Sequence, residues 1–493
     1  MTRRWGRRRR ITTAALLSLV LAAVAAGDVS TGGEPARPLA LGDDRQLFVD
    51  SALVAELRGL TFRLHPPTPR EVVIRYDQAW EGDTSWHPIV IQDGDRFRMW
   101  YRASAGNQDA EARTAYAESR DGINWTKPVL GLISFQGSTA NNLVWPPAGK
   151  RGINLCVFKD GNSSAPAQER YKAIMQAPYN APRGQAVYGL VSADGLRWRS
   201  MQEEPLLPEL SDGPHAAFWD PWERHYVIYR RAWWPPGSMP KGNRTFQRTV
   251  SKDFRRWSER QFVDLVFGAT PREQFYTSAC QPYTRAHGVY LSFPMRFIEE
   301  RQFFPDWPFP GLSDVGFLSS RDGIHWDRTF REAFIRPGLD PDNWHERSMA
   351  FGSGIVETGS GELSMYMTEH HRTGTAHIRR VTLRPDGFAS IQASELGGEL
   401  LTRTIVFAGK RLALNYSTSA TGSVRVEILD SIGRPVPGYS AGESVEIFGD
   451  ELDRIVGWRA HTDVSALAGQ AVRLRFHLRD ADLYAFRFVR AGS

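Results

Sequence analysis

A seven-residue phrase recurs along this chain and limits the folds open to it. Close copies read SRDGINW at 119–125, SADGLRW at 192–198 and SRDGIHW at 320–326, and a looser copy, SKDFRRW, lies at 251–257. Asp-Gly favours a tight hairpin turn because both residues tolerate positive φ. Alternating apolar residues precede the three close copies. Each phrase therefore predicts a strand, a turn and a second strand whose tryptophan packs back onto the sheet.

The spacing of the phrases predicts a repeated β unit. Their tryptophans, at positions 125, 198, 257 and 326, lie 73, 59 and 69 residues apart. An aromatic-rich strand precedes the phrases, as in HPIVIQDGDRFRMWYRA (87–103), and a fifth unit ends in the decayed phrase RPDGF. We expect an all-β fold with a five-bladed β-propeller over residues 45–392. The alternative is a long β-sandwich in which the Asp-Gly turns recur by coincidence.

The residue pattern changes at both ends of this array. Residues 396–493 alternate strongly and lack the phrase, which predicts a smaller C-terminal β-sandwich. At the other end, six arginines among the first ten residues are followed by the apolar run ITTAALLSLVLAAVAAG. This pattern predicts a signal peptide at 1–26 and a linker at 27–44, and hence a secreted or periplasmic protein without a stable membrane anchor. A retained membrane anchor is the alternative.

Charge and cysteine content exclude some classes of protein. The formal net charge is +6, and the six N-terminal arginines account for all of it (6 − 6 = 0), so we expect no nucleic-acid partner. Cys156 and Cys280 could form one disulfide or remain buried thiols, and two cysteines make no zinc framework. His370 and His371 in TEHH would point to opposite faces of a strand, so we predict no metal site and no cofactor.

The units resemble a known family of enzymes. The segment FWDPWERHYVIYRR is similar to the Asp-Pro element on an inner blade strand of the five-bladed β-propeller glycosidases of glycoside hydrolase families 32 and 43. The whole chain also resembles secreted bacterial proteins with an LFVD start, this propeller and a C-terminal sandwich. The resemblance implies a secreted glycoside hydrolase acting on an oligo- or polysaccharide. Its catalytic groups would be three acids in the axial funnel, since protonating the leaving oxygen and attacking the anomeric carbon are opposite tasks.

Carrying this pattern onto the sequence succeeds in part. Asp220 in FWDP matches the second acid, but His87 in SWHP and Gln281 in CQP stand where acids would be expected. The acids that we predict to be catalytic are Asp220, Asp83, Glu81, Glu273 and Glu346. The residues that we predict to bind substrate are His87, Trp86, Trp219 and Trp344, since apolar sugar faces stack on aromatic rings.

Each candidate also has a structural interpretation. An acid beside a turn proline is often a turn former, the loop acids can be solvated, and Glu273 and Glu346 can pair with neighbouring cations such as Arg272 and Arg347. The two departures from the pattern favour a non-catalytic, lectin-like propeller as an alternative function. A sialidase-like enzyme is a further alternative, because the phrase resembles the Asp-box of that fold, which has six blades.

Overall fold

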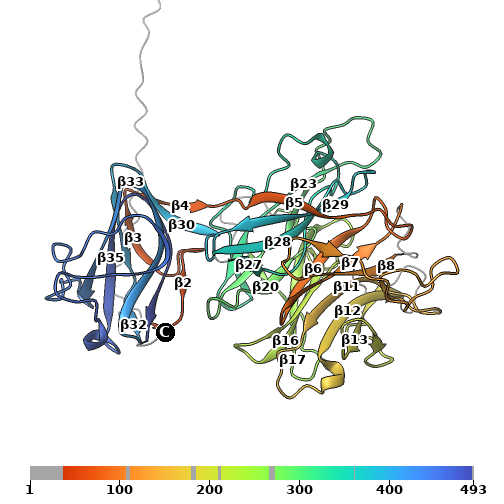
Figure 1. The fold of residues 1–493 in the computed structure, drawn as a ribbon, viewed down its shortest axis with the longest axis horizontal. Helices are drawn as coiled ribbons and strands as arrows, with labels where there is room; N and C mark the ends of the chain where they lie inside the picture. Colours follow the sequence, from red (N-terminus) through yellow and green to blue (C-terminus); the bar gives the residue numbers. More distant parts are fainter. Residues whose placement is uncertain are drawn as a thin grey trace, which may run out of the picture. The chain divides into compact units, whose positions relative to one another are not determined.

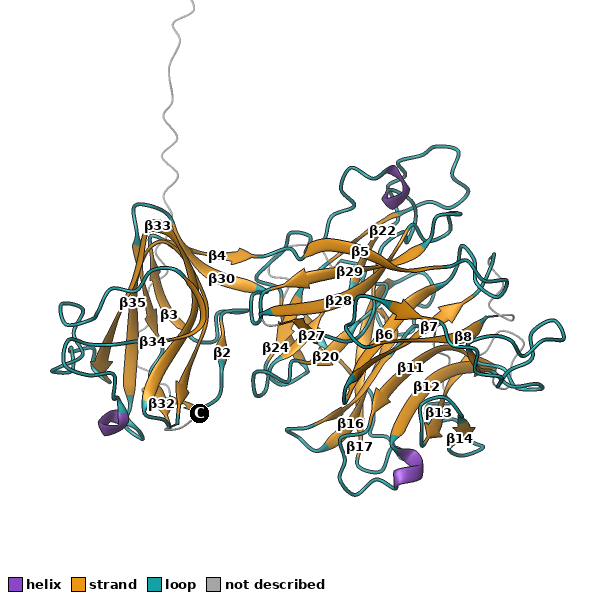
Figure 2. Ribbon diagram, viewed as in Figure 1, coloured by secondary structure: helices purple, strands orange, loops and turns teal. Residues whose placement is uncertain are grey.

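Strands make up nearly all of the regular structure. A computed structural model describes residues 37–106, 112–178, 185–208, 212–265, 273–359 and 361–490, so the predicted signal peptide lies outside the described residues. Within these ranges the helical elements are the short 3-10 turns η2 (Ala167–Glu169), η3 (Pro341–Asn343) and η4 (Ser465–Leu467) (Figure 2). No helix described there is long and apolar enough to span a bilayer.

Five sheets form the blades of a β-propeller (Figure 1). Blade I contains β6 (Trp86–Asp93), β7 (Arg96–Ala103), β8 (Arg113–Ser119), β9 (Trp125–Thr126) and β10 (Leu143–Trp145). Blade II contains β11 (Ile153–Lys159), β12 (Tyr171–Pro178), β13 (Gln185–Ser192) and β14 (Arg199–Ser200). Blade III contains β15 (Ala216–Asp220), β16 (His225–Trp234), β17 (Asn243–Ser251) and β18 (Gln261–Phe262).

The last two blades are less regular. Blade IV contains β20 (Cys280–Pro282), β21 (Tyr290–Ser292), β24 (Leu318–Ser320), β25 (His325–Asp327) and the added strand β19 (Asp264–Leu265). A separate hairpin, β22 (Met295–Ile298) and β23 (Leu312–Val315), is inserted between β21 and β24. Blade V contains β26 (Ala350–Phe351), β27 (Val356–Gly359), β28 (Glu362–Glu369), β29 (His377–Leu383) and β5 (Thr68–Arg75). Five blades confirm the predicted propeller and argue against the six-bladed sialidase-like alternative.

The repeated phrase forms the turn between the third and fourth strands of blades I to IV, as predicted. In blade I the Asp121 carboxylate accepts hydrogen bonds from the two backbone amides that follow the glycine, at 2.8 and 2.7 Å. The Gly122 carbonyl accepts from the Tyr366 hydroxyl of blade V at 2.6 Å, and the Gly323 carbonyl of blade IV accepts from Tyr229 of blade III at 2.6 Å. The phrase recurs because its turn joins each of these blades to the preceding one.

The ring of blades is closed by an N-terminal strand. β5 pairs antiparallel with β29, placing Ile74 opposite Ile378, so the outermost strand of blade V comes from the start of the propeller sequence. Closure by a distant strand ties the two ends of the array together.

The C-terminal strands form a ten-stranded sheet that also takes in N-terminal strands. Its members are β1 (Leu39–Gly42), β2 (Gln46–Leu47), β3 (Val54–Arg58), β4 (Leu60–Leu64), β30 (Ala389–Ala393), β31 (Gly398–Thr402), β32 (Ile405–Phe407), β33 (Arg411–Asp430), β34 (Asp450–Ile455) and β35 (Val472–Val489). The predicted boundaries therefore need correction: β2, β3 and β4 pair with C-terminal strands and not with a blade, and β1 lies within the predicted linker. The reason is burial, because Phe48, Leu53 and Leu60 fill the core of this sheet.

The inner strands set the geometry of the site. β6, β11, β15, β20 and β26 line the axis, and Ile89 of β6 forms a parallel bridge to Ser353 of blade V. The N-terminal ends of these strands therefore meet at one end of the axis. Cys156 and Cys280, on two of the inner strands, are both buried and form no disulfide.

Candidate functional site

The inner strands begin with unusual backbone conformations. His87, Asn154 and Ala279 lie at or just before the starts of β6, β11 and β20 with φ of 61°, 54° and 41°. The pairing register of β6 and of β11 also shifts at this point. Positive φ in residues other than glycine costs free energy and is concentrated at functional sites. This end of the axis is therefore a candidate functional site.

Polar contacts lie at this end of blades I, II and III, and one of them links blade I to blade II. The Arg102 guanidinium of blade I donates to Asn154 Oδ1 of blade II at 3.3 Å, and Asn154 Nδ2 donates to Gln176 Oε1 at 2.8 Å. In blade III, His215 stands just before β15 as His87 stands at the start of β6, and its Nδ1 accepts from the Arg231 amide at 3.3 Å.

The contacts continue through blades IV and V. Arg231 Nε donates to the Tyr276 carbonyl at 3.0 Å, and Arg347 Nη1 donates to the Tyr276 hydroxyl at 2.6 Å. The His371 ring stacks on Trp86 of blade I, with centroids 5.2 Å apart and planes 27° apart. We call the whole set the polar ring; it consists of Asp83, His87, Arg102, Asn154, Gln176, His215, Arg231, Tyr276, Glu346, Arg347, His371 and Arg372.

Three buried histidines in the polar ring are held neutral. Burial, reinforced by the charge of Arg102, lowers the pKa of His87 to about 4. Burial and neighbouring arginines also lower the pKa of His215 and that of His371 well below the ordinary value for histidine. Neutral imidazoles beside guanidinium groups can accept a hydrogen bond from a bound molecule.

Two of the predicted acids belong to the polar ring. Glu346 is buried, accepts a hydrogen bond from Arg347 Nε, and lies 3.4 Å from Arg372 Nη1. Asp83 is half-buried; its Oδ1 accepts from the Gly106 amide at 2.7 Å, and its carbonyl accepts from the Arg372 amide at 2.6 Å. Arg372 thus contacts both acidic residues.

Asp220 is not part of this site, and the prediction that its carboxylate faces the funnel was wrong. Its fully buried side chain accepts from the amides of Trp222 and Glu223 at 3.0 and 3.1 Å and from the Tyr290 hydroxyl at 2.5 Å. Because side chains alternate along a strand, Asp220 lies on the face of β15 toward Tyr290 of blade IV, opposite to the face of Trp219. Asp220 is a turn former between β15 and β16.

Glu81 and Glu273 are also committed to structural contacts. Buried Glu81 accepts from Lys127 Nζ at 2.6 Å and from the Tyr101 hydroxyl at 2.5 Å. Glu273 accepts from Arg296 Nη1 at 3.0 Å and from Arg328 Nε at 2.9 Å, at the base of the β22–β23 hairpin. These side-chain partners of the two acids are not members of the polar ring, so neither acid is assigned to it.

The predicted substrate-binding residues lie in three places. His87 belongs to the polar ring, and buried Trp86 packs on His371, so the indole face of Trp86 in that contact is covered. Trp344, two residues before Glu346 in the chain, is half-buried, and its Nε1 donates to the Gly338 carbonyl at 2.9 Å. Trp219 lies away from the polar ring, in a cavity on the axis.

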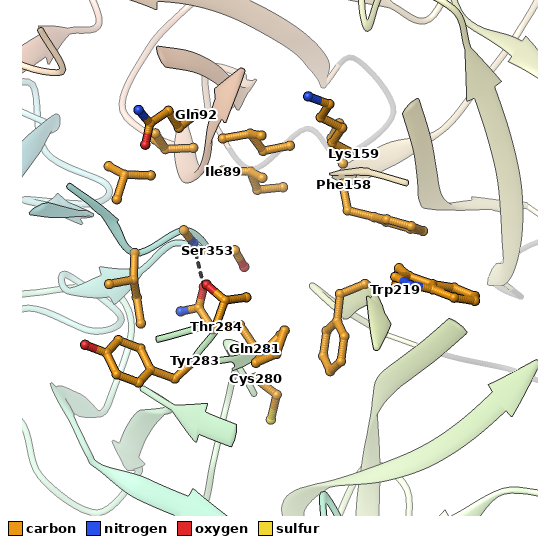
Figure 3. Close-up of a pocket in the computed structure, with 18 of the residues that line it drawn as sticks. Ile89, Gln92, Phe158, Lys159, Trp219, Cys280, Gln281, Tyr283, Thr284 and Ser353 are labelled. Carbon is orange, nitrogen blue, oxygen red and sulfur yellow. Dashed lines mark hydrogen bonds between the residues drawn. The ribbon is translucent and has the colours of Figure 1, made fainter. Parts of the chain in front are cut away.

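That axial cavity has a volume of about 470 Å³ and lies between the five inner strands (Figure 3). Phe158 and Trp219 form part of its wall, and Gln281 Oε1 accepts from the Gly354 amide at 2.9 Å, which explains why no acid is needed at position 281. Among the described residues that line the cavity, the one acid is Glu357, and Arg285 pairs with it. The axial cavity therefore lacks the two carboxylates that the predicted chemistry requires.

One cluster of metal-ligating side chains lies among the described residues, formed by Asp340, Asp342 and His370. His370 Nε2 lies 3.0 Å from Asp340 Oδ2, and His370 Nδ1 lies 3.0 Å from Thr375 Oγ1. Because both ring nitrogens already have hydrogen-bonding partners, these contacts account for the cluster without an ion. His370 and His371 lie in the turn after β28, so the strand alternation predicted for them does not apply, although their surroundings differ.

Most of the polar ring was not predicted from the sequence, including His215, Arg231, Tyr276, His371 and Arg372. A signal for His215 was present, because it precedes AAFW as His87 precedes PIVI, at the start of an inner strand. The two arginines and Tyr276 gave no comparable signal, since their proximity depends on closure of the propeller.

Comparisons with known proteins extend over part of the chain. No family model matches it. The uncharacterised proteins MT1551 and Rv1502 of Mycobacterium tuberculosis, from strains CDC 1551 / Oshkosh and ATCC 25618 / H37Rv, are 30% and 29% identical to it over 122 residues. This match covers 24% of this chain and 34% of each relative. The chain thus spans about a third of the length of the curated relatives that it matches.

Solved structures with a related fold include three enzymes. The β-1,2-mannobiose phosphorylase of Listeria innocua is 11% identical, with a TM-score of 0.45 over 65% of this chain and 97% of that chain. The N-acetylgalactosamine deacetylase of F. plautii is 13% identical, with a TM-score of 0.43 over 66% and 95%. A glycosyl hydrolase of Bacteroides ovatus is 12% identical, with a TM-score of 0.41 over 70% and 97%. These identities and TM-scores are too low to support an argument about function. A functional proposal for this chain rests on the five-bladed propeller and its polar ring.

Proposed function

We propose that this protein is a glycan-active enzyme that hydrolyses a glycosidic bond at the polar ring, with Glu346 and Asp83 as its catalytic carboxyl groups. The observation that carries the proposal is the contact of both residues with Arg372. The other three predicted acids are committed to turns or ion pairs elsewhere, so these two remain.

The chemistry assigns different tasks to the two groups. Glycoside hydrolysis needs one carboxyl group to protonate the leaving oxygen and a second to attack the anomeric carbon or to activate water. Glu346, held by the guanidinium groups of Arg347 and Arg372, suits the base or nucleophile, because those contacts fix a charged carboxylate in position. Half-buried Asp83 suits the proton donor. The neutral histidines supply hydrogen-bonding partners for sugar hydroxyl groups.

The test is hydrolysis of a panel of aryl glycosides and polysaccharides by the full chain. Glu346→Gln and Asp83→Asn should each lower turnover by about 10²- to 10⁴-fold, the usual contribution of a positioned acid or base. Glu357→Gln is the matched control, because Glu357 is also paired with an arginine but lies at the axial cavity. Full activity in both ring variants would contradict the assignment.

A lectin-like glycan-binding protein is the second candidate. It is favoured by the structural roles of Asp220, Glu81 and Glu273, which leave the polar ring with two of the five predicted acids. A binding protein would show affinity for a glycan in calorimetry and no hydrolysis of any substrate in the panel. The glycan would remain as intact with the wild type as with Glu346→Gln.

A further inference from the structure

The β22–β23 hairpin carries an unusually aromatic loop beside the polar ring. Residues 299–311, between the two strands, read EERQFFPDWPFPG, with Phe303, Phe304, Trp307 and Phe309 among three prolines. We call this segment the aromatic loop. It is an insertion, since the hairpin pairs with itself and does not extend the sheet of blade IV.

The base of the hairpin is fixed to the site. The Tyr276 amide of the polar ring donates to the Met295 carbonyl of β22 at 2.8 Å. Arg296 of β22 pairs with Asp314 of β23 and with Glu273, at 2.6 and 3.0 Å. The predicted acid Glu273 therefore has a positioning role, because it holds the strand that leads into the aromatic loop.

The loop itself is held in one conformation. The Gln302 side-chain amide donates to the Phe304 carbonyl at 3.0 Å and to the Trp307 carbonyl at 2.7 Å, and the Trp307 amide donates to the Phe304 carbonyl at 3.1 Å. These contacts within the loop present its rings in a defined arrangement without a sheet around them.

The rings lie on the segment of blade V that carries the proposed base. Phe309 lies 3.9 Å from the Arg372 guanidinium, and Trp307 lies 4.0 Å from the His345 ring, measured to the ring centroids. Phe303 lies 5.3 Å from Trp344 at 32° between planes. Phe304 connects Phe303 to the catalytic segment, because its ring lies 4.9 Å from Phe303 and stacks 4.7 Å from His345, the residue before Glu346.

The outer end of this path is exposed to solvent. Phe303 is 55% exposed and Trp344 is half-buried. Exposed polar residues lie near Phe303 in the sequence of the loop, among them Arg301, Gln302 and Asp306. A flat aromatic surface within a polar rim suits a sugar, which has an apolar face for stacking and hydroxyl groups around its edge.

We propose that Phe303 and Trp344 form a stacking platform for the sugar residues of a glycan chain that continues beyond the sugar bound at Glu346. The inference rests on the proposed glycan-active function and specifies its substrate as an oligosaccharide or polysaccharide with several residues, rather than a single glycoside. The stacking of Phe304 on His345 supports this, because His345 lies between Trp344 and Glu346 in the chain and so places the platform next to the catalytic carboxylate.

Affinity electrophoresis tests the proposal on the full chain. Native gels are cast with arabinoxylan, linear arabinan, pectin, β-mannan or laminarin, and retardation gives a dissociation constant for each. At least one polysaccharide should retard the wild type, and Phe303→Ala and Phe303→Ala/Trp344→Ala should weaken that binding by about three- to tenfold for each ring removed. Phe448→Ala is the matched control, because Phe448 is 66% exposed and lies just before β34 of the ten-stranded sheet.

The arms of the experiment separate this inference from the proposed hydrolysis. Glu346→Gln should lose hydrolysis but still be retarded by the polysaccharide. If the wild type shows no hydrolysis but is retarded in a way that depends on Phe303, the proposed hydrolysis is refuted and the platform is not. The platform is refuted if no polysaccharide retards the wild type, or if the Phe303 variants are retarded like the wild type. It is also refuted if the wild type self-associates in size-exclusion chromatography and Phe303→Ala abolishes this without changing retardation. Phe303 would then form a contact between two copies of the chain.

Discussion

The Arg372 guanidinium lies 3.4 Å from the Glu346 carboxylate in the polar ring. Arg372 adopts a positive φ of 70°, and its amide donates to the Asp83 carbonyl. One residue of blade V therefore contacts the carboxylate of Glu346 and the backbone of Asp83, which belongs to the loop before blade I. Arg372 is a positioning residue in this scheme.

Arg372→Lys should lower kcat strongly while the protein stays folded. Lysine keeps the charge but lacks the planar fork that reaches Glu346 and lies on Phe309, and misplacement of a catalytic group by about 1 Å costs on the order of 10²-fold in rate. Steady-state kinetics on the substrate found in the panel measure the effect. Arg285→Lys is the control, because Arg285 also contacts two carboxylates, Glu357 and Asp386. Equal loss in both variants would contradict a specific role for Arg372.

The stability of the protein should depend on the neutral state of His87. Its pKa is about 4 in the folded protein and about 6.5 in the unfolded chain, so the unfolded chain binds the extra proton between these values. Stability is therefore full above about pH 6.5 and falls as the pH drops toward 4, by on the order of 3 kcal/mol for this residue. His215 and His371 contribute with the same sign.

His87→Gln should flatten this pH dependence, since glutamine does not titrate. The measurement is the free energy of unfolding in urea between pH 7 and pH 4. His325→Gln serves as the control, because Asp322 raises the pKa of exposed His325 and its loss should not flatten the curve. A slope that is identical in the wild type and His87→Gln would show that His87 does not titrate in this window.

The sequence predicted the blades well because the chemistry of a turn is local. Asp-Gly and the following tryptophan determine a hairpin within seven residues, and three such hairpins with one looser copy at similar spacing define an array. The assignment of β2 to β4 failed because nothing local distinguishes a strand of a blade from a strand that pairs with residues hundreds of positions away. The ten-stranded sheet is a non-local result of burying Phe48 and Leu53.

The site was harder to predict for the same reason. Asp220 fitted a motif, but its role depends on Tyr290 and on the face of β15 that it occupies. Glu346 was identified from its sequence context, whereas its partner Arg372 becomes its neighbour only in the folded chain. A motif predicts which strand a residue lies on, but the role of that residue depends on the side chains that it contacts in the folded chain.

Asp220→Ala should destabilise the protein without altering the activity of the folded fraction. The substitution leaves two amides and the Tyr290 hydroxyl without their buried acceptor, which should cost about 3 kcal/mol. Chemical unfolding and kinetics at a temperature where the variant is folded measure the two effects. Asp95→Ala, at an exposed ion pair with Arg120, should change stability by less than about 0.5 kcal/mol. A large loss of kcat in folded Asp220→Ala would restore Asp220 as a catalytic candidate.

The glycine of the repeated phrase should be required for packing between blades as well as for the turn. Gly122 has a φ of 72°, and a Cβ there would lie 2.5 Å from Thr358 Cγ2 and 2.8 Å from the Tyr366 hydroxyl of blade V. Gly94 has a similar φ of 66° but faces open space, so Gly94→Ala isolates the backbone cost, about 1–2 kcal/mol. Gly122→Ala should lose about 1–3 kcal/mol more, because the added methyl group overpacks the contact between blades. The free energy of unfolding of the two variants decides the matter: equal losses would mean that the phrase recurs for its turn alone.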